Sequence, residues 1–148
     1  MFRLSILFLV LFKLTSLHAQ HKDSNKLIDL NLDLSNAFLK AQDQWKIDHP
    51  NDPQVFAYCV YRSNATQAKY YAQGRTKKGP IITNVKRNGM HNRYPSRAID
   101  VIFRKNNKEI WNQKWYDLFS LYMKRYEKRV VYGGSWRTIN DYPHFEIK

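Results

Sequence analysis

Residues 98–103 read AIDVIF, and this short apolar segment decides the fold. Alternate residues of a β-strand face opposite sides, so Asp100 shares its side with Ala98 and Ile102 and has apolar neighbours whichever side is buried. A buried carboxylate without a partner is strongly destabilising unless it meets a cation or becomes neutral. Two partners stay open: one of the many basic side chains, or a metal ion for which His91 upstream could supply a second ligand.

The residues before this strand predict two helices and one further strand. Apolar residues at helical spacing predict a helix from about residue 35, which the two prolines of HPNDP end. The run QVFAYCVY predicts a buried strand, and a short helix should follow between Ser63 or Asn64 and Gly74. We expect residues 75–97 to form loop, with one brief extended piece near IIT.

The residues after AIDVIF complete an α+β pattern. An apolar stripe predicts a long helix over residues 107–128, and RVVY and HFEI predict two strands joined by a turn at GGSW. The resulting order of elements predicts an α+β domain with a small antiparallel sheet and flanking helices.

The first 19 residues have the layout of a secretory signal peptide. An early basic residue precedes the apolar run LSILFLVLF, and small Ala19 ends the segment. An uncleaved N-terminal anchor is the alternative. We therefore expect export to the periplasm or the extracellular space, a polar N-terminal lead over residues 20–33, and one folded, monomeric domain over residues 34–148.

The chain is strongly basic and has one cysteine. Its net charge is +13, and removal of residues 1–19 would take away Arg3 and Lys13 and no acid, leaving +11. Such a field attracts nucleic acid, anionic lipid or acidic cell-wall polymers and by itself selects none of them. Cys59 cannot form an internal disulfide, and we expect it to pack as a small buried apolar residue.

The C-terminal stretch NDYPHFEIK supplies a third candidate ligand. His144 begins the predicted last strand, and Asp141 precedes it by three residues. A lone histidine at such a position is more often a satisfied core residue. Together, however, His91, Asp100 and His144 form the mixed nitrogen and oxygen set that suits zinc with an open fourth position.

Four ordered blocks of sequence carry a specific resemblance. They are YRSNATQAKYYAQGRT, IITN, HNRYPSRAIDV, and YGGSW with DYPHFEI. Together they resemble the zinc-dependent peptidoglycan peptidases of the D-Ala-D-Ala carboxypeptidase superfamily, and most closely the L-alanyl-D-glutamate endopeptidases of the phage endolysin type. The resemblance spans about residues 34–148 and implies a zinc peptidase domain with the Hedgehog/D-Ala-D-Ala peptidase type of fold.

The resemblance also implies roles for individual residues. His91, Asp100 and His144 match the zinc ligands, and Asp141 matches the catalytic acid/base. Arg62 matches the arginine that faces the substrate and helps to hold its carboxylate or polarised carbonyl. Gln67 would support Arg62, and Ser63 would be a helix cap or a minor contact.

Charge adds further candidates, because a D-glutamate carboxylate in the substrate would suit a positively charged cleft. Lys86 and Arg87 are such candidates. Arg93 and Arg97 flank the predicted ligand loop and could also serve, with surface solubility as the alternative.

The chain departs from the commoner family pattern, Ser-x-His-x-x-Gly-x-Ala-x-Asp, in two places. Gly89 replaces the serine, and the interval from His91 to Asp100 is two residues longer and contains Pro95 and Ser96. Elsewhere, Ser135 of GGSW stands where relatives often carry aspartate, which predicts a weaker hydrogen bond behind a metal ligand.

The leading hypothesis is a secreted zinc peptidase that cuts the peptidoglycan stem peptide between L-Ala and D-Glu. A D,D-carboxypeptidase or dipeptidase would use the same ligands and base and stays open. A non-catalytic module that binds wall polymer or another polyanion is a third hypothesis, against which the retained Asp141 argues. We expect no nucleic-acid partner, because no recognition motif is present, and no stable membrane insertion after signal removal.

Overall fold

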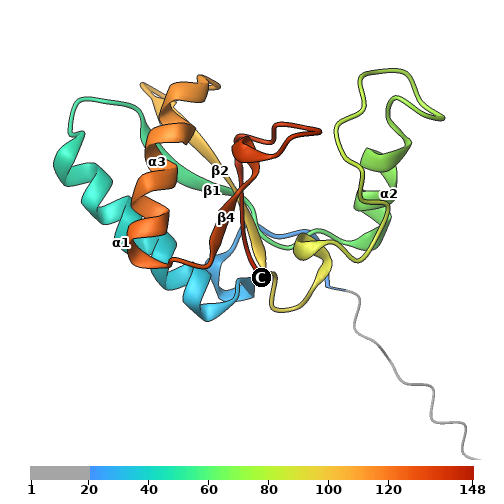
Figure 1. The fold of residues 1–148 in the computed structure, drawn as a ribbon, viewed down its shortest axis with the longest axis horizontal. Coiled ribbons are helices and arrows are strands. Elements are labelled where there is room, and N and C mark those ends of the chain that lie inside the picture. Colours follow the sequence, from blue (N-terminus) through green and yellow to red (C-terminus); the bar gives the residue numbers. More distant parts are fainter. Residues whose placement is uncertain (1–20) are drawn as a thin grey trace, which may run out of the picture.

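The computed structural model describes residues 21–148, which form a five-stranded antiparallel sheet flanked by three α-helices (Figure 1). The predicted signal peptide lies outside the described residues. Within residues 21–148, no helix is long and apolar enough to cross a membrane. The five strands and three α-helices of residues 21–148 confirm the predicted α+β class.

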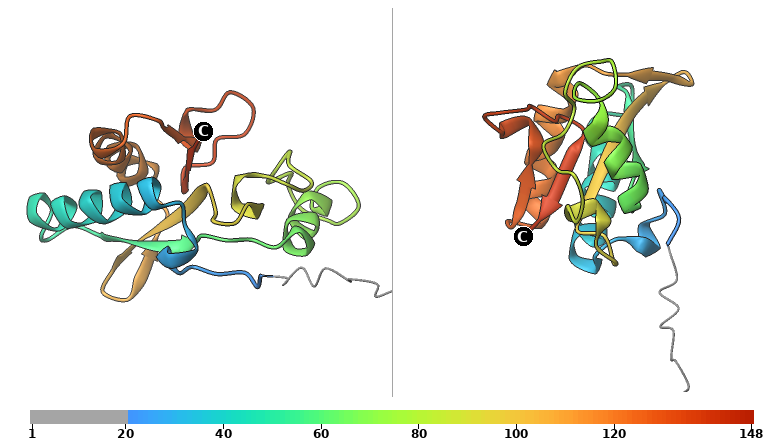
Figure 2. Two further views of the ribbon diagram at one scale, coloured as in Figure 1. Left: turned by 90° about the horizontal axis from the view of Figure 1, so that it is seen from below. Right: turned by 90° about the vertical axis from the view of Figure 1, so that its right-hand side faces the viewer.

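Strand β2 lies at the centre of the sheet. The strand order is β1-β2-β5-β4, and β3 also pairs with β2. The strands are β1 (Gln54–Cys59), β2 (Ala98–Lys105), β3 (Lys108–Ile110), β4 (Val130–Tyr132) and β5 (His144–Ile147). The helices are α1 (Leu32–Asp48), α2 (Asn64–Ala72) and α3 (Gln113–Tyr126). Helices α1 and α3 lie side by side at one end of the molecule, and α2 with its following loop lies at the other (Figures 1 and 2).

The hydrophobic core lies between the sheet and the α1–α3 pair. Alternate residues of β2 and β5 enter it, among them Phe103 and Phe145, as the strand period predicts. Trp45 of α1 is fully buried, and its ring packs 5.3 Å from Phe103 and 5.7 Å from Phe119 between centroids. Its Nε1 donates a hydrogen bond to the carbonyl of Pro53 at 3.0 Å, so the indole is both packed and satisfied.

The helix predicted over residues 107–128 is wrong at its start. Asn106 and Asn107 both have positive φ, 51° and 61°, and form a tight turn that returns the chain as β3 against β2. Asparagine tolerates this left-handed backbone better than other side chains, which explains why a hairpin forms here. Helix α3 starts only at Gln113, where the side chain of Asn112 caps it.

The described part of the expected polar lead, residues 21–33, packs against the domain. The carbonyl of Ser24 accepts backbone hydrogen bonds from Val60 and Tyr61, at 2.8 and 3.0 Å, and Leu30 is buried. Helix α1 already begins at Leu32, three residues earlier than expected. The brief extended piece expected near IIT forms no strand among the described residues.

Trp45 provides a test of the core. We expect Trp45→Ala to lower the free energy of unfolding by about 3–5 kcal/mol, because it removes a buried indole and leaves a cavity. Ile47→Ala on the same helix is the matched control, since Ile47 is 71% exposed, and it should change stability by about 0.5 kcal/mol or less. Chemical denaturation measures both values, and equal losses would contradict the assigned core.

Candidate active site

Strand pairing brings the three candidate ligands together. Asp100 of β2 lies directly opposite His144 of β5, and His91 approaches from the 3₁₀ turn Met90–Asn92 that precedes β2. Oδ1 of Asp100 lies 3.0 Å from Nε2 of His91 and 3.1 Å from Nδ1 of His144. The two imidazole nitrogens lie 3.2 Å apart. The structure therefore gathers all three predicted ligands at one buried point.

In each histidine, the outer ring nitrogen makes a hydrogen bond that determines which of the two ring nitrogens carries the proton. Nδ1 of His91 donates to the carbonyl of Val60 at 2.7 Å, since a carbonyl can only accept. Nε2 of His144 lies 3.1 Å from Oε2 of Glu146, which as a carboxylate also accepts. In the neutral histidines, the lone pairs of the two inner nitrogens therefore converge on the oxygen of Asp100. Two nitrogen lone pairs and a carboxylate oxygen that point at one position repel one another, and a cation bound between them would stabilise the arrangement.

The spacing of these atoms fits a zinc ion. Ligand atoms at about 2.0–2.1 Å from a tetrahedral ion lie roughly 3.3 Å from one another. The three observed separations, 3.0 to 3.2 Å, match this value within a few tenths of an ångström. The carboxylate behind His144 is also the partner that metal-bound histidines commonly have. His91, Asp100 and His144 could thus hold zinc and leave a fourth position free.

The charges of the site are strongly coupled. Burial opposes the charged form of His91, but the neighbouring Asp100 outweighs it and raises the pKa of His91 to about 10. Burial likewise opposes ionisation of Asp100, yet the two histidines hold the pKa of its carboxyl well below the ordinary value. Without a metal, protons on the histidines would supply the positive charge that Asp100 requires.

Asp141 is held beside the ligands by a close backbone contact. Its backbone N–H donates to the carbonyl of Gly133 at 3.1 Å, and its own carbonyl accepts from the backbone of His144. A Cβ atom at position 133 would lie 2.5 Å from the Asp141 oxygen, so only glycine fits there. Burial, and then repulsion from Asp100, raise the pKa of the Asp141 carboxyl, which suits a group that exchanges protons.

Arg62 occupies the second oxygen of Asp100. Its Nη2 donates to Oδ2 at 2.8 Å, and its Nη1 donates to Oε1 of Gln67 at 3.1 Å. Gln67 is 97% buried and is itself anchored by a hydrogen bond to the carbonyl of Val85. The basic partner considered for Asp100 is therefore present at Oδ2, and Oδ1 faces the two histidines that could hold a metal ion.

A cavity of about 360 Å³ opens above these groups. It is lined by the three candidate ligands together with Arg62, Gln67, Asp141 and Trp136, among others. Ser63 does not line it and instead caps α2 by accepting a hydrogen bond from the backbone of Thr66. The basic candidates Lys86, Arg87, Arg93 and Arg97 do not line it either.

Comparison with known proteins gives matches in both sequence and structure. No family model matches the chain. Over 95 residues it is 30% identical to the peptidoglycan L-alanyl-D-glutamate endopeptidase CwlK of Bacillus subtilis (strain 168), an alignment that covers 59% of this chain and 56% of CwlK. The chain therefore spans little more than half the length of this curated relative.

The crystal structure of the L-Ala D-Glu endopeptidase ChiX of Serratia marcescens shares the fold. Its TM-score is 0.64 at 20% identity, over 82% of this chain and 83% of that one. The structural match confirms the predicted fold. The sequence match agrees with the resemblance to peptidoglycan peptidases that the four sequence blocks carry.

The sequence places Glu146 on the same strand face as His144 but assigns no role to it, and it gives no indication of a role for Trp136. Glu146 holds His144, and the ring of Trp136 lies 5.0 Å from the His144 ring between centroids. The alternation of HFEI signals Glu146, because residues two apart on a strand share a face. Ser135, the departure from the family pattern, bonds instead to the carbonyl of Tyr132, so Glu146 supplies the contact behind the ligand.

Cys59 differs from the buried apolar residue that was expected. A bulge in β1 between Ala57 and Cys59 places it opposite Asp100, where it is only partly buried and lines the cavity. Its sulfur accepts a weak hydrogen bond from Nη2 of Arg62 at 3.6 Å. The bulge thus turns one position of β1 toward the site.

The charge coupling predicts how stability depends on pH. A folded pKa of about 10 for His91, above its ordinary 6.5, means that this pairing stabilises the chelator-treated protein fully below pH 6.5 and is lost toward pH 10. We expect the melting temperature to fall over this range, and to fall less in His91→Gln. His21→Gln, at an exposed histidine, is the control and should follow the unsubstituted protein. Parallel curves for all three proteins would contradict the coupling.

Proposed function

We propose that the protein is an exported zinc peptidase that hydrolyses the peptidoglycan stem peptide between L-Ala and D-Glu. The observation that carries this proposal is the convergence of His91, Asp100 and His144 in a cavity that is also lined by the partly buried Asp141. The L-alanyl-D-glutamate endopeptidase activity of CwlK supports the choice of substrate. Export rests on the signal-like residues 1–19.

His91, Asp100 and His144 would hold the metal, with Val60 and Glu146 fixing the orientation of the two imidazoles. When bound, zinc would supply a Lewis acid that polarises the scissile carbonyl and lowers the pKa of a water molecule. Asp141 would accept a proton from the attacking water and deliver it to the leaving amine. Its raised pKa matches both directions of this transfer.

Arg62 would assist at the substrate. Three of its contacts, to Asp100, Gln67 and Cys59, are within the protein. A guanidinium carries five N–H donors, so donors remain for a substrate carboxylate or for the oxyanion of the tetrahedral state. The fixed pairing with Gln67 would keep the arginine oriented without rearrangement during the reaction.

Two other functions remain candidates. A D,D-carboxypeptidase or dipeptidase would use the same ligands and the same base, so only the cut site distinguishes it. A non-catalytic module that binds wall polymer would have no use for a carboxyl of raised pKa beside an open ligand position, and Asp141 therefore argues against it.

Cleavage of purified muropeptides tests the proposal. The zinc-loaded protein should give products split between L-Ala and D-Glu in mass spectrometry, and a chelator should abolish them. Asp141→Asn should lower kcat about 10²- to 10⁴-fold, the usual contribution of a positioned acid/base, while retaining zinc. Asp43→Asn removes a carboxylate that is 72% exposed on α1 and should leave the rate unchanged.

Each alternative gives a different result in this experiment. Release of terminal D-Ala would identify a carboxypeptidase. Binding to muropeptides without any cleavage would favour the wall-binding module, and full activity of Asp141→Asn would remove this residue from the mechanism.

Glu146 provides a separate test of the metal site. Glu146→Gln keeps the shape of the side chain but removes the negative charge behind His144, so zinc affinity should fall about 10- to 100-fold. Competition with a chromophoric chelator measures this change. Glu109→Gln, on the exposed hairpin strand β3, is the control, and equal affinities of both variants would show that His144 does not bind metal through the predicted geometry.

A further inference from the structure

A second and larger cavity lies directly beside the site. Its volume is about 660 Å³, within the range of pockets that hold small organic ligands. Four residues line both cavities: Tyr58, Cys59, Arg62 and Tyr70. The two cavities therefore adjoin along this common wall.

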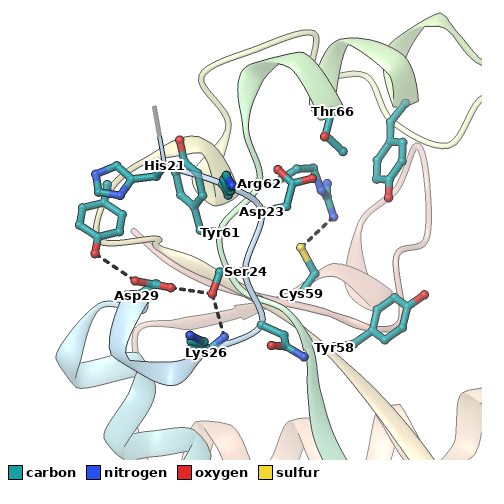
Figure 3. Close-up of a pocket in the computed structure, with 14 residues that line it drawn as sticks. His21, Asp23, Ser24, Lys26, Asp29, Tyr58, Cys59, Tyr61, Arg62 and Thr66 are labelled. Carbon is teal, nitrogen blue, oxygen red and sulfur yellow. Dashed lines mark hydrogen bonds between the residues drawn. The ribbon is translucent and has the colours of Figure 1, made fainter. Parts of the chain in front are cut away.

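The N-terminal segment builds the outer wall of this second cavity (Figure 3). Ser24 fastens the segment to the end of β1 through backbone hydrogen bonds with Val60 and Tyr61. Oδ1 of Asp23 accepts a hydrogen bond from the backbone of Ser63 at 2.7 Å, which ties the same segment to the start of α2. The wall is thus a fixed part of the domain.

Aromatic rings form much of the lining. Tyr58 and Tyr94 are 49% and 50% exposed, so their rings are accessible to a ligand. The ring of His21 stacks on Tyr94 with 3.6 Å between centroids, and Tyr61 meets both rings edge-on. Such rings offer apolar faces together with polar edges, which suits a ligand that is itself amphipathic.

The charges of the lining are balanced. The lining contains three cationic side chains, Lys22, Lys26 and Arg62, and two aspartates, Asp23 and Asp29. Arg62 is paired with Asp100 of the first cavity, which leaves the two lysines to balance the two aspartates. Hydrogen bonds from Ser24 and Tyr94 lower the pKa of Asp29, so it remains an acceptor. A lining balanced in this way suits a neutral ligand with many hydrogen-bonding groups better than one with several negative charges.

We infer that this second cavity binds the N-acetylated amino sugar to which the stem peptide is attached. The inference rests on the proposed function. L-Ala is the first residue of the stem and is joined to the sugar by an amide, so the cut bond lies one residue from a neutral polyhydroxylated ring. The other occupant, the stem peptide beyond D-Glu, carries several carboxylates and fits the balanced lining and its two aspartates less well.

Kinetics on two substrates test the inference. One is a muropeptide that carries the disaccharide, and the other is the same stem peptide with the sugar removed. The protein should cleave the first with the higher kcat/KM, because binding of the remote sugar also stabilises the transition state. Tyr94→Ala should lower the ratio of the two kcat/KM values roughly tenfold, in keeping with the loss of one aromatic contact.

Two further variants are the controls for this experiment. Tyr94→Phe keeps the ring and loses only the hydrogen bond to Asp29, so it should retain most of the preference for the sugar. Tyr126→Ala, at an exposed tyrosine at the end of α3 outside the cavity, should leave the ratio unchanged. Equal kcat/KM values on both substrates, or a ratio that Tyr94→Ala does not alter, would overturn the inference.

Direct binding separates this inference from the proposed function. If neither substrate is cleaved, titration with the peptide-free disaccharide still reports on the cavity through amide chemical shifts in NMR. Shifts at Tyr61 and Tyr94 that weaken in Tyr94→Ala would support the sugar site even when the activity fails. Absence of shifts at these residues would overturn it.

Discussion

The structure depends on one buried carboxylate in its central strand. Asp100 lies between apolar neighbours in β2, where an unpaired carboxylate would be strongly destabilising. Its Oδ2 accepts a hydrogen bond from Arg62, and its Oδ1 faces the histidines that could hold a metal ion. Those partners come from three separate parts of the chain: Arg62 after β1, His91 before β2, and His144 at the start of β5. The contacts that pair the Asp100 carboxylate are therefore the same contacts that assemble the site. This explains why the segments before and after β2 converge on Asp100.

One face of β2 packs in the hydrophobic core, and the other face lines the cavity of the candidate site. Ile99 and Phe103 enter the aromatic core, and Asp100 between them faces the cavity. Because the period of a strand is two, the register that buries the core also aims the carboxylate. On β5, His144 and Phe145 divide in the same way. Strand pairing thus places Asp100 and His144 on a packed scaffold, and the segments outside the strands bring His91, Arg62 and Asp141 to them.

Much of this could be predicted from the sequence, because short segments carried it. The alternation of apolar residues in AIDVIF and HFEI predicts two strands, and the candidate ligands His91, Asp100 and His144 lie in or beside them. The missed features depend on contacts between distant residues or on turn chemistry. The hairpin at Asn106 is a local signal that the apolar stripe after it obscured. The bulge at Cys59 and the pairing of Ser24 with β1 depend on tertiary contacts that no local pattern records.

The charge of the chain and the charge of its cavities act over different distances. A net charge of +13 creates a field that draws the protein toward anionic polymers, and salt screens this field within about 10 Å. Inside the second cavity, Lys22 and Lys26 balance Asp23 and Asp29, and Arg62 is paired with Asp100, so the long-range field does not choose the ligand there. Under the proposed function, attraction to an anionic wall and selection of one bond within it could therefore be tuned independently, the first by surface lysines and the second by the groups around Asp100.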